Sequence, residues 1–143
     1  MTTGQFDVVC VGNALVDVQA KVEDSFVAKH GPAKGGMRLV DAAQAEAIYN
    51  DLPPAHETSG GSGANSIAVL ASLGGKGGFI GRVAADELGA VFAHDLKAQG
   101  VAFAETARDT AEPTGRCLIA VTPDGERTMN TSLGCNVNFG PVD

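Results

Sequence analysis

Residues 59–66 read Ser-Gly-Gly-Ser-Gly-Ala-Asn-Ser and run directly into an apolar segment, Ile67–Leu73, with the composition of a helix. Glycine adopts positive φ at low cost and lets another molecule approach the main chain closely. The junction predicts a turn into a helix N-terminus, where unpaired N–H groups can meet a polar ligand. Asn65 and Ser66 could cap that helix or bond a hydroxyl-rich ligand. The alternative is close packing, because the P-loop and dinucleotide-binding spacings are absent.

Composition excludes several classes of partner. The 143 residues suit one domain, and 44% are hydrophobic, as expected of a soluble globular protein. The net charge is −7 with scattered Lys and Arg, so neither nucleic acid nor a membrane surface is an expected partner. Residues 1–6 lack a secretory pattern, and no stretch approaches the ~20 apolar residues of a membrane span, which predicts a cytoplasmic location. Cys10, Cys117 and Cys135 lie in apolar surroundings and lack metal-ligand spacing, which predicts buried, reduced thiols and no metal site.

Strands and helices alternate around the glycine stretch. Residues 6–11 are almost continuously apolar, which predicts a strand near the middle of a parallel sheet, buried on both faces. Helical periodicity covers residues 42–51, 64–73 and the segment that Asp86 begins, and strands are expected at 77–83 and 101–103. The pattern is that of an α/β fold.

A second, smaller sheet is predicted from a hairpin. Residues 116–122 and 126–132 alternate between apolar and polar across the tight-turn sequence Thr-Pro-Asp-Gly at 122–125. The alternating segment at 14–22 and the strand at 37–40 are expected to join this sheet. Asp17, in the first of these, is either the solvent-side residue of an alternating strand or a carboxylate at the ligand-binding edge of the sheet.

These motifs together resemble the PfkB, or ribokinase-like, carbohydrate and nucleoside kinases. The matching residues are Gly12-Asn13 with Asp17, the turn at 60–65, Leu73–Lys76 with Phe79–Val83, Asp86–Gly89, and the hairpin from Pro113–Arg116 to Arg127–Asn130. The resemblance covers essentially the whole chain. Residues 12–17 and 127–130 are most similar to the adenosine-kinase-like and related bacterial sugar-kinase branch.

The resemblance implies part of a ribokinase-like three-layer α/β core with a small β-sheet lid. The lid strands would lie approximately within residues 14–40 and 115–133, and the core approximately within 4–13 and 41–114. Residues 1–143 would then be the N-terminal part of a kinase whose ATP-binding half is absent.

The resemblance also implies that a sugar or nucleoside binds between lid and core, with ATP and Mg²⁺ supplied by the absent half. A carboxylate and an amide together accept from and donate to vicinal hydroxyls, which agrees with that implication. Arg127, on the hairpin, is similar to an arginine that approaches the transferred phosphate in some members, or else it is an exposed hairpin residue. The residues implied to bind the substrate are Asn13, Asp17, Gly60, Gly61 and Asn65.

The chain departs from the family pattern at several points. Ala84-Ala85 replaces Gly-Asp, Ile67 replaces a small residue, and Gly77-Gly78 replaces apolar residues, which is expected to weaken that strand. The family's second signature, Asp-Thr-x-Gly-Ala-Gly-Asp, is absent. Because that signature supplies the general base, we expect no catalytic base in this chain and no phosphotransfer by it alone.

Two other functions remain open. An exposed small sheet could make the chain a stand-alone binding module or a homodimer joined through that sheet. A Rossmann-type nucleotide-binding function is a weaker alternative, because no Gly-x-Gly-x-x-Gly follows the first strand.

Overall fold

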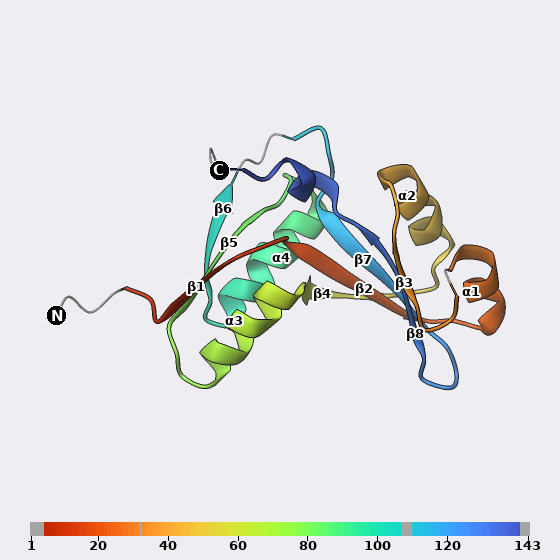
Figure 1. Cartoon of the computed structure of the whole chain (residues 1–143), viewed down its shortest axis with the longest axis horizontal. Helices are drawn as coiled ribbons and strands as arrows, with labels where there is room; N and C mark the ends of the chain where they lie inside the picture. The colour runs from red at the N-terminus through yellow and green to blue at the C-terminus, as the bar shows by residue number, and fades with distance from the viewer. Residues whose placement is uncertain (1–4, 32, 107–109, 141–143) are drawn as a thin grey trace.

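The computed structural model describes residues 5–31, 33–106 and 110–140, which form two β-sheets and their helices (Figure 1). The helices are α1 (Asp24–His30), α2 (Ala42–Asp51), α3 (Ser62–Ser72), α4 (Glu87–Ala98) and the short 3₁₀ helix η1 (Gly134–Asn138). The strands are β1 (Val8–Val11), β2 (Leu15–Lys21), β3 (Met37–Leu39), β4 (His56–Gly60), β5 (Gly77–Arg82), β6 (Ala102–Thr106), β7 (Gly115–Val121) and β8 (Arg127–Ser132). None of the helices in these ranges has the length and apolarity that a bilayer crossing requires.

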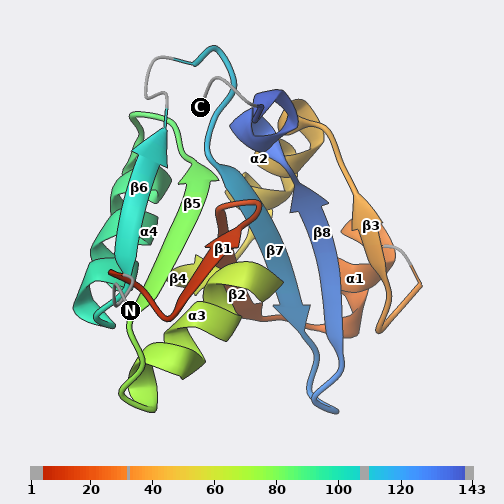
Figure 2. The ribbon, with the colours of Figure 1, turned by 60° about the vertical axis from the view of Figure 1, so that its left-hand side comes forward.

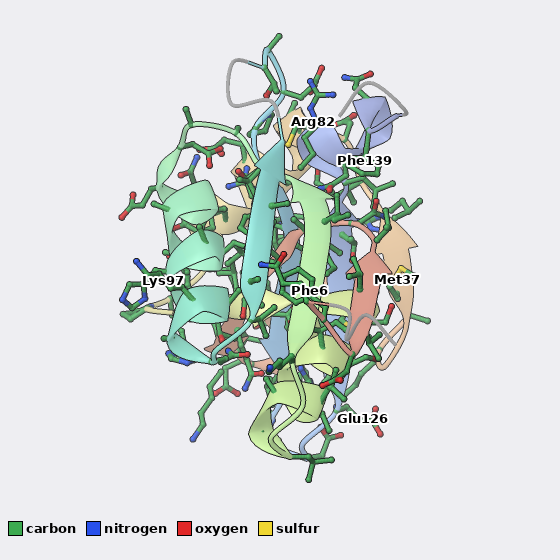
Figure 3. All side chains as sticks on the ribbon, turned by 90° about the vertical axis from the view of Figure 1, so that its left-hand side faces the viewer. Phe6, Met37, Arg82, Lys97, Glu126 and Phe139 are labelled. Atoms are coloured by element: carbon green, nitrogen blue, oxygen red, sulfur yellow. The ribbon has the colours of Figure 1, made fainter. Side chains whose placement is uncertain are left out.

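One sheet has three parallel strands in the order β1-β5-β6. α3 and α4 lie between this sheet and the second one and contact strands of both (Figure 1). The core at this junction is aromatic: Phe79 and Phe92 are fully buried, with ring centroids 5.7 Å apart. Figure 3 shows the opposite face of β5 and β6, over which no described helix lies.

The position predicted for the first strand needs a correction. β1 pairs only with β5 among the described residues, so it lies at an edge of the sheet rather than near its middle. Val8, Val9 and Val11 are therefore 47%, 49% and 59% exposed, not buried on both faces. The apolar sequence of β1 is typical of a central strand, but no described strand pairs with the free edge of β1.

The second sheet has five strands in the order β3-β8-β7-β2-β4 (Figure 2). Its hairpin, β7 and β8, is antiparallel as predicted, and the Thr122 N–H donates to the Glu126 carbonyl across the turn. β2 and β3 join the sheet, also as predicted. One face, with Val16, Val18 and Leu118, packs into the core.

β4 was not predicted. It pairs antiparallel with β2. The strand lies inside the range 41–114 that is expected to form the core, yet it belongs to the five-stranded sheet. The division of the chain into lid and core stays a prediction. Its sequence, His-Glu-Thr-Ser-Gly, has no apolar alternation, and pairing with β2 rather than local propensity makes it a strand. The predicted start of the core, residue 4, and the predicted end of the kinase portion, residue 143, lie outside the described residues.

Candidate functional site

The Asp17 carboxylate lies against the backbone of Gly60. β2 and β4 are paired so that Leu15 is opposite Gly60 and Asp17 is opposite Thr58, which places Asp17 and Gly60 on the same face. A Cβ on Gly60 would lie 2.4 Å from the Asp17 Cγ, far inside any real contact. Glycine is therefore required at position 60 for the carboxylate to occupy this place.

Gly61 makes the turn that joins β4 to α3. Its φ is +91°, and it is the N-cap residue of the helix. A Cβ at this position would be 3.0 Å from the carbonyl oxygen of Asn13. The structure thus brings Asn13, Asp17, Gly60 and Gly61 together where the β1–β2 connection meets the start of α3. Their role in binding stays a prediction.

Asn65 lies in the first turn of α3, where its N–H donates to the Gly61 carbonyl. Its side chain is exposed and makes no hydrogen bond within the described part of the chain. The Ser66 hydroxyl donates to the Ser62 carbonyl, and the N-terminus of α3 has no side-chain cap. Of the two roles left open for Asn65, capping is therefore wrong, and its amide is available to a ligand.

Arg127 stands on the same face of the five-stranded sheet as Asp17. Asp17 is paired with Cys117 on β7, and Cys117 is paired with Thr131 on β8. Arg127 lies four residues before Thr131 on β8, so its side chain is on the same face. The guanidinium is exposed and donates to Gln19 Oε1 at 3.4 Å. Burial raises the pKa of Asp17, and the positive charge of Arg127 offsets part of that rise.

Cys117 is a neighbour of Asp17 that was not predicted to lie at the site. Its thiol accepts a hydrogen bond from Thr131 Oγ1 at 3.3 Å, and burial raises its pKa. The alternation of β7 was the available signal, because it puts Cys117 on the face opposite Leu118. All three cysteines are free, and Cys117 and Cys135 are buried. Cys10 is only partly buried, so the prediction of a buried thiol is wrong at that position.

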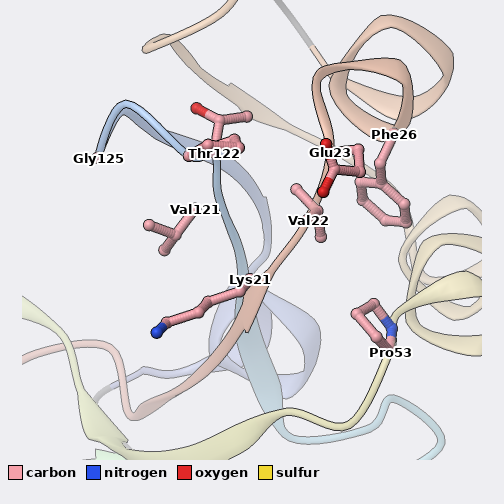
Figure 4. Close-up of a pocket in the computed structure, with 9 residues that line it drawn as sticks. Lys21, Val22, Glu23, Phe26, Pro53, Val121, Thr122 and Gly125 are labelled. Carbon is pink, nitrogen blue, oxygen red and sulfur yellow. The ribbon is translucent and has the colours of Figure 1, made fainter.

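A separate cavity of about 740 Å³ lies beyond the end of β2 (Figure 4). Its walls include Val22, Phe26, Pro53 and Val121, and none of the residues predicted to bind a substrate lines it. The described residues contain no group of three acidic, histidine or cysteine side chains that could hold a metal ion.

The model of the pfkB carbohydrate kinases matches residues 5–142. The chain belongs to the pfkB family. A probable sugar kinase from Rhizobium etli is 48% identical, with a TM-score of 0.88 over 99% of this chain and 43% of that one. The adenosine kinase of Sinorhizobium meliloti is also 48% identical, with a TM-score of 0.87 over 98% of this chain and 43% of that one. The probable chloroplastic fructokinase-6 of Arabidopsis thaliana is 32% identical over 84% of this chain and 26% of its own length.

These comparisons confirm the resemblance to the PfkB family and the α/β fold class drawn from the sequence. This pfkB-family chain spans less than half the length of each of these relatives.

Proposed function

We propose that this chain is the substrate-binding and lid-bearing portion of a kinase. The kinase transfers the γ-phosphoryl group of ATP to a primary hydroxyl of a ribose-containing nucleoside, such as adenosine, or of a sugar. Family membership supports the reaction class, and the two 48% identical structures, named as a sugar kinase and an adenosine kinase, support the substrate class.

The observation that carries the proposal is the Asp17 carboxylate held against Gly60. A half-buried carboxylate next to the N-terminus of α3 accepts hydrogen bonds from two hydroxyls of a sugar ring. The exposed amide of Asn65, one helical turn away, supplies both a donor and an acceptor. Ligands that lack a hydroxyl would leave the carboxylate unpaired, which is the basis for strong selection against them.

The chain alone is proposed to be inactive. The Asp-Thr-x-Gly-Ala-Gly-Asp signature does not occur in it, so it has no general base of that kind. Mg²⁺–ATP would be bound by the remaining part of a longer kinase, and the predicted division at 1–143 is part of this proposal. Arg127 is proposed to approach the transferred phosphoryl group and stabilise its charge. The protein is also proposed to be cytoplasmic.

The test is a phosphotransfer assay on the full protein that carries this chain, with ATP and Mg²⁺ and a panel of adenosine, guanosine, ribose and fructose. Phosphorylation of at least one panel member is expected. Arg127→Ala should lower turnover while leaving the affinity for the hydroxyl substrate unchanged. Absence of turnover on the whole panel would contradict the proposed reaction.

A dimerising module is the second candidate. Met37 and Leu39 on the edge strand β3 are 59% and 62% exposed, and the β1 edge exposes three valines. Light scattering separates the two functions. A stable symmetric dimer of residues 1–143 without ligand affinity would support the module, and a monomer would count against it.

A further inference from the structure

The buried side chain of Asn136 is bonded to both backbone groups of Ala14, 122 residues earlier in the chain. Its Oδ1 accepts from the Ala14 N–H at 2.9 Å. Its Nδ2 donates to the Ala14 carbonyl at 2.9 Å and to the Leu133 carbonyl at 2.9 Å. The amide therefore pairs with Ala14 as a neighbouring strand would.

Ala14 lies where the chain passes from one sheet to the other. β1 ends at Val11 in the three-stranded sheet, and β2 begins at Leu15 in the five-stranded sheet. Asn13 precedes Ala14 directly, and Asp17 follows it by three residues. The backbone conformation at Ala14 therefore determines the positions of Asn13 and Asp17, two of the proposed substrate-binding residues.

η1, which carries Asn136, is anchored by contacts that do not involve Ala14. The Cys135 N–H donates to the Pro113 carbonyl at 2.8 Å. Gly134 has a φ of +53°, and a Cβ there would lie 2.2 Å from the same carbonyl oxygen. A Cβ on Gly115 would lie 2.7 Å from Asn136 Nδ2, so glycine at 115 leaves room for the amide. Asn136 is thus held in place by η1, and its hydrogen bonds to Ala14 fix the β1–β2 connection.

We propose that Asn136 is a positioning residue. It holds the Asn13–Asp17 segment in the conformation that binds the hydroxyl substrate, without contacting that substrate. The part of this proposal that concerns ligand affinity rests on the proposed function. The part that concerns the backbone of residues 13–17 does not.

The experiment uses the full protein with Asn136→Ala, Asn136→Asp and a matched control, Asn130→Ala. Asn130 is as deeply buried as Asn136 but accepts its hydrogen bond from the Arg38 side chain, away from the β1–β2 connection. Two quantities are measured: hydrogen exchange of the amides of residues 13–17, and affinity for adenosine and ribose by calorimetry.

Asn136→Ala should raise exchange at Ala14 by about tenfold or more and lower affinity by about tenfold, since a buried hydrogen-bonding group loses its partner. Asn136→Asp keeps the acceptor for the Ala14 N–H, so it should preserve protection of that amide better than the alanine variant does. Asn130→Ala should lose stability without either effect.

Unchanged exchange at Ala14 in Asn136→Ala would overturn the proposal, as would equal losses of affinity in the alanine variants of Asn136 and Asn130. If the unaltered protein bound no panel ligand, the proposed function would fail. Exchange at residues 13–17 would then decide the positioning role by itself.

Discussion

The side chain of Ile67 occupies the space that a side chain on Gly77 would need. A Cβ on Gly77 would lie 2.5 Å from Ile67 Cγ2, and both residues are buried. The resemblance to the family predicts that both positions differ from the usual pattern, with a larger residue at 67 and a glycine at 77. In the structure the two residues fit each other across the contact between α3 and β5, so glycine at 77 makes room for core packing.

Gly77→Ala should destabilise the protein by about 1–3 kcal/mol, because the added methyl overpacks the core. Ile67→Ala should cost about 2–5 kcal/mol through the cavity it leaves. The double variant should be less destabilised than the two single losses added together. Urea unfolding measures all three. Gly78→Ala is the control, since a Cβ there makes ordinary contacts at 3.5 Å or more. Additive losses would contradict direct compensation.

Gly60→Ala should displace the Asp17 carboxylate. The expected result is a loss of affinity for a hydroxyl ligand of about tenfold or more, as hydrogen bonds to the displaced carboxylate are lost. Gly12→Ala is a suitable control, because a Cβ on Gly12 would approach Phe79 no closer than 3.7 Å. Isothermal calorimetry measures both variants. Equal affinities for Gly60→Ala and the unaltered protein would show that the carboxylate does not bind the ligand.

Asp17 should make stability fall as the pH rises. Its folded-state pKa lies above the ordinary value of 3.8 because of burial, so the folded state binds more protons than the unfolded state between the two pKa values. Asp17→Asn should therefore raise the unfolding midpoint at pH 7. That advantage should shrink as the pH falls through the raised pKa and vanish below about 3.8. Thermal unfolding across this range checks the sign, and a variant less stable than the unaltered protein at pH 7 would contradict it.

Lys34 joins the hairpin turn to α1. Its ammonium contacts Asp124 and Asp24 at 2.6 Å each, and hydrogen bonds from Lys34 and Thr122 lower the pKa of Asp124 to about 2. The depressed pKa means that the Lys34–Asp124 contact stabilises the fold above pH 3.8 and is lost as the pH falls toward 2. Titration of the Asp124 carboxyl by NMR should show the low pKa, and Lys34→Met should return it toward 3.8. A titration unchanged by that substitution would exclude Lys34 as the cause.

The sequence predicts the elements whose pattern is local. The hairpin of β7 and β8 follows from alternation and a tight turn, and the caps at Asp41 and Asp86 follow from residue type, since both accept backbone N–H bonds. β4 could not be predicted because its strand conformation depends on β2. The edge position of β1 could not be predicted either, because an apolar run does not show which strands pair with it.

The candidate site was predictable in its residues but not in its geometry. Asp17, Gly60 and Gly61 were singled out from motif resemblance, whereas the contact that makes glycine necessary at 60 depends on the register between β2 and β4. Asn136 had no sequence signal, because its partner, Ala14, lies at the other end of the chain.

A calorimetric titration of the full protein with adenosine, ribose and fructose tests whether Asp17 binds the hydroxyl substrate. It uses the unaltered protein, Asp17→Ala and Asp24→Ala. Asp24 is an exposed carboxylate whose partner is Lys34, so it controls for loss of a negative charge. We predict that the unaltered protein and Asp24→Ala bind at least one of these ligands with the same affinity and that Asp17→Ala loses that binding. Undiminished affinity of Asp17→Ala for every ligand that the unaltered protein binds would exclude Asp17 from the binding site.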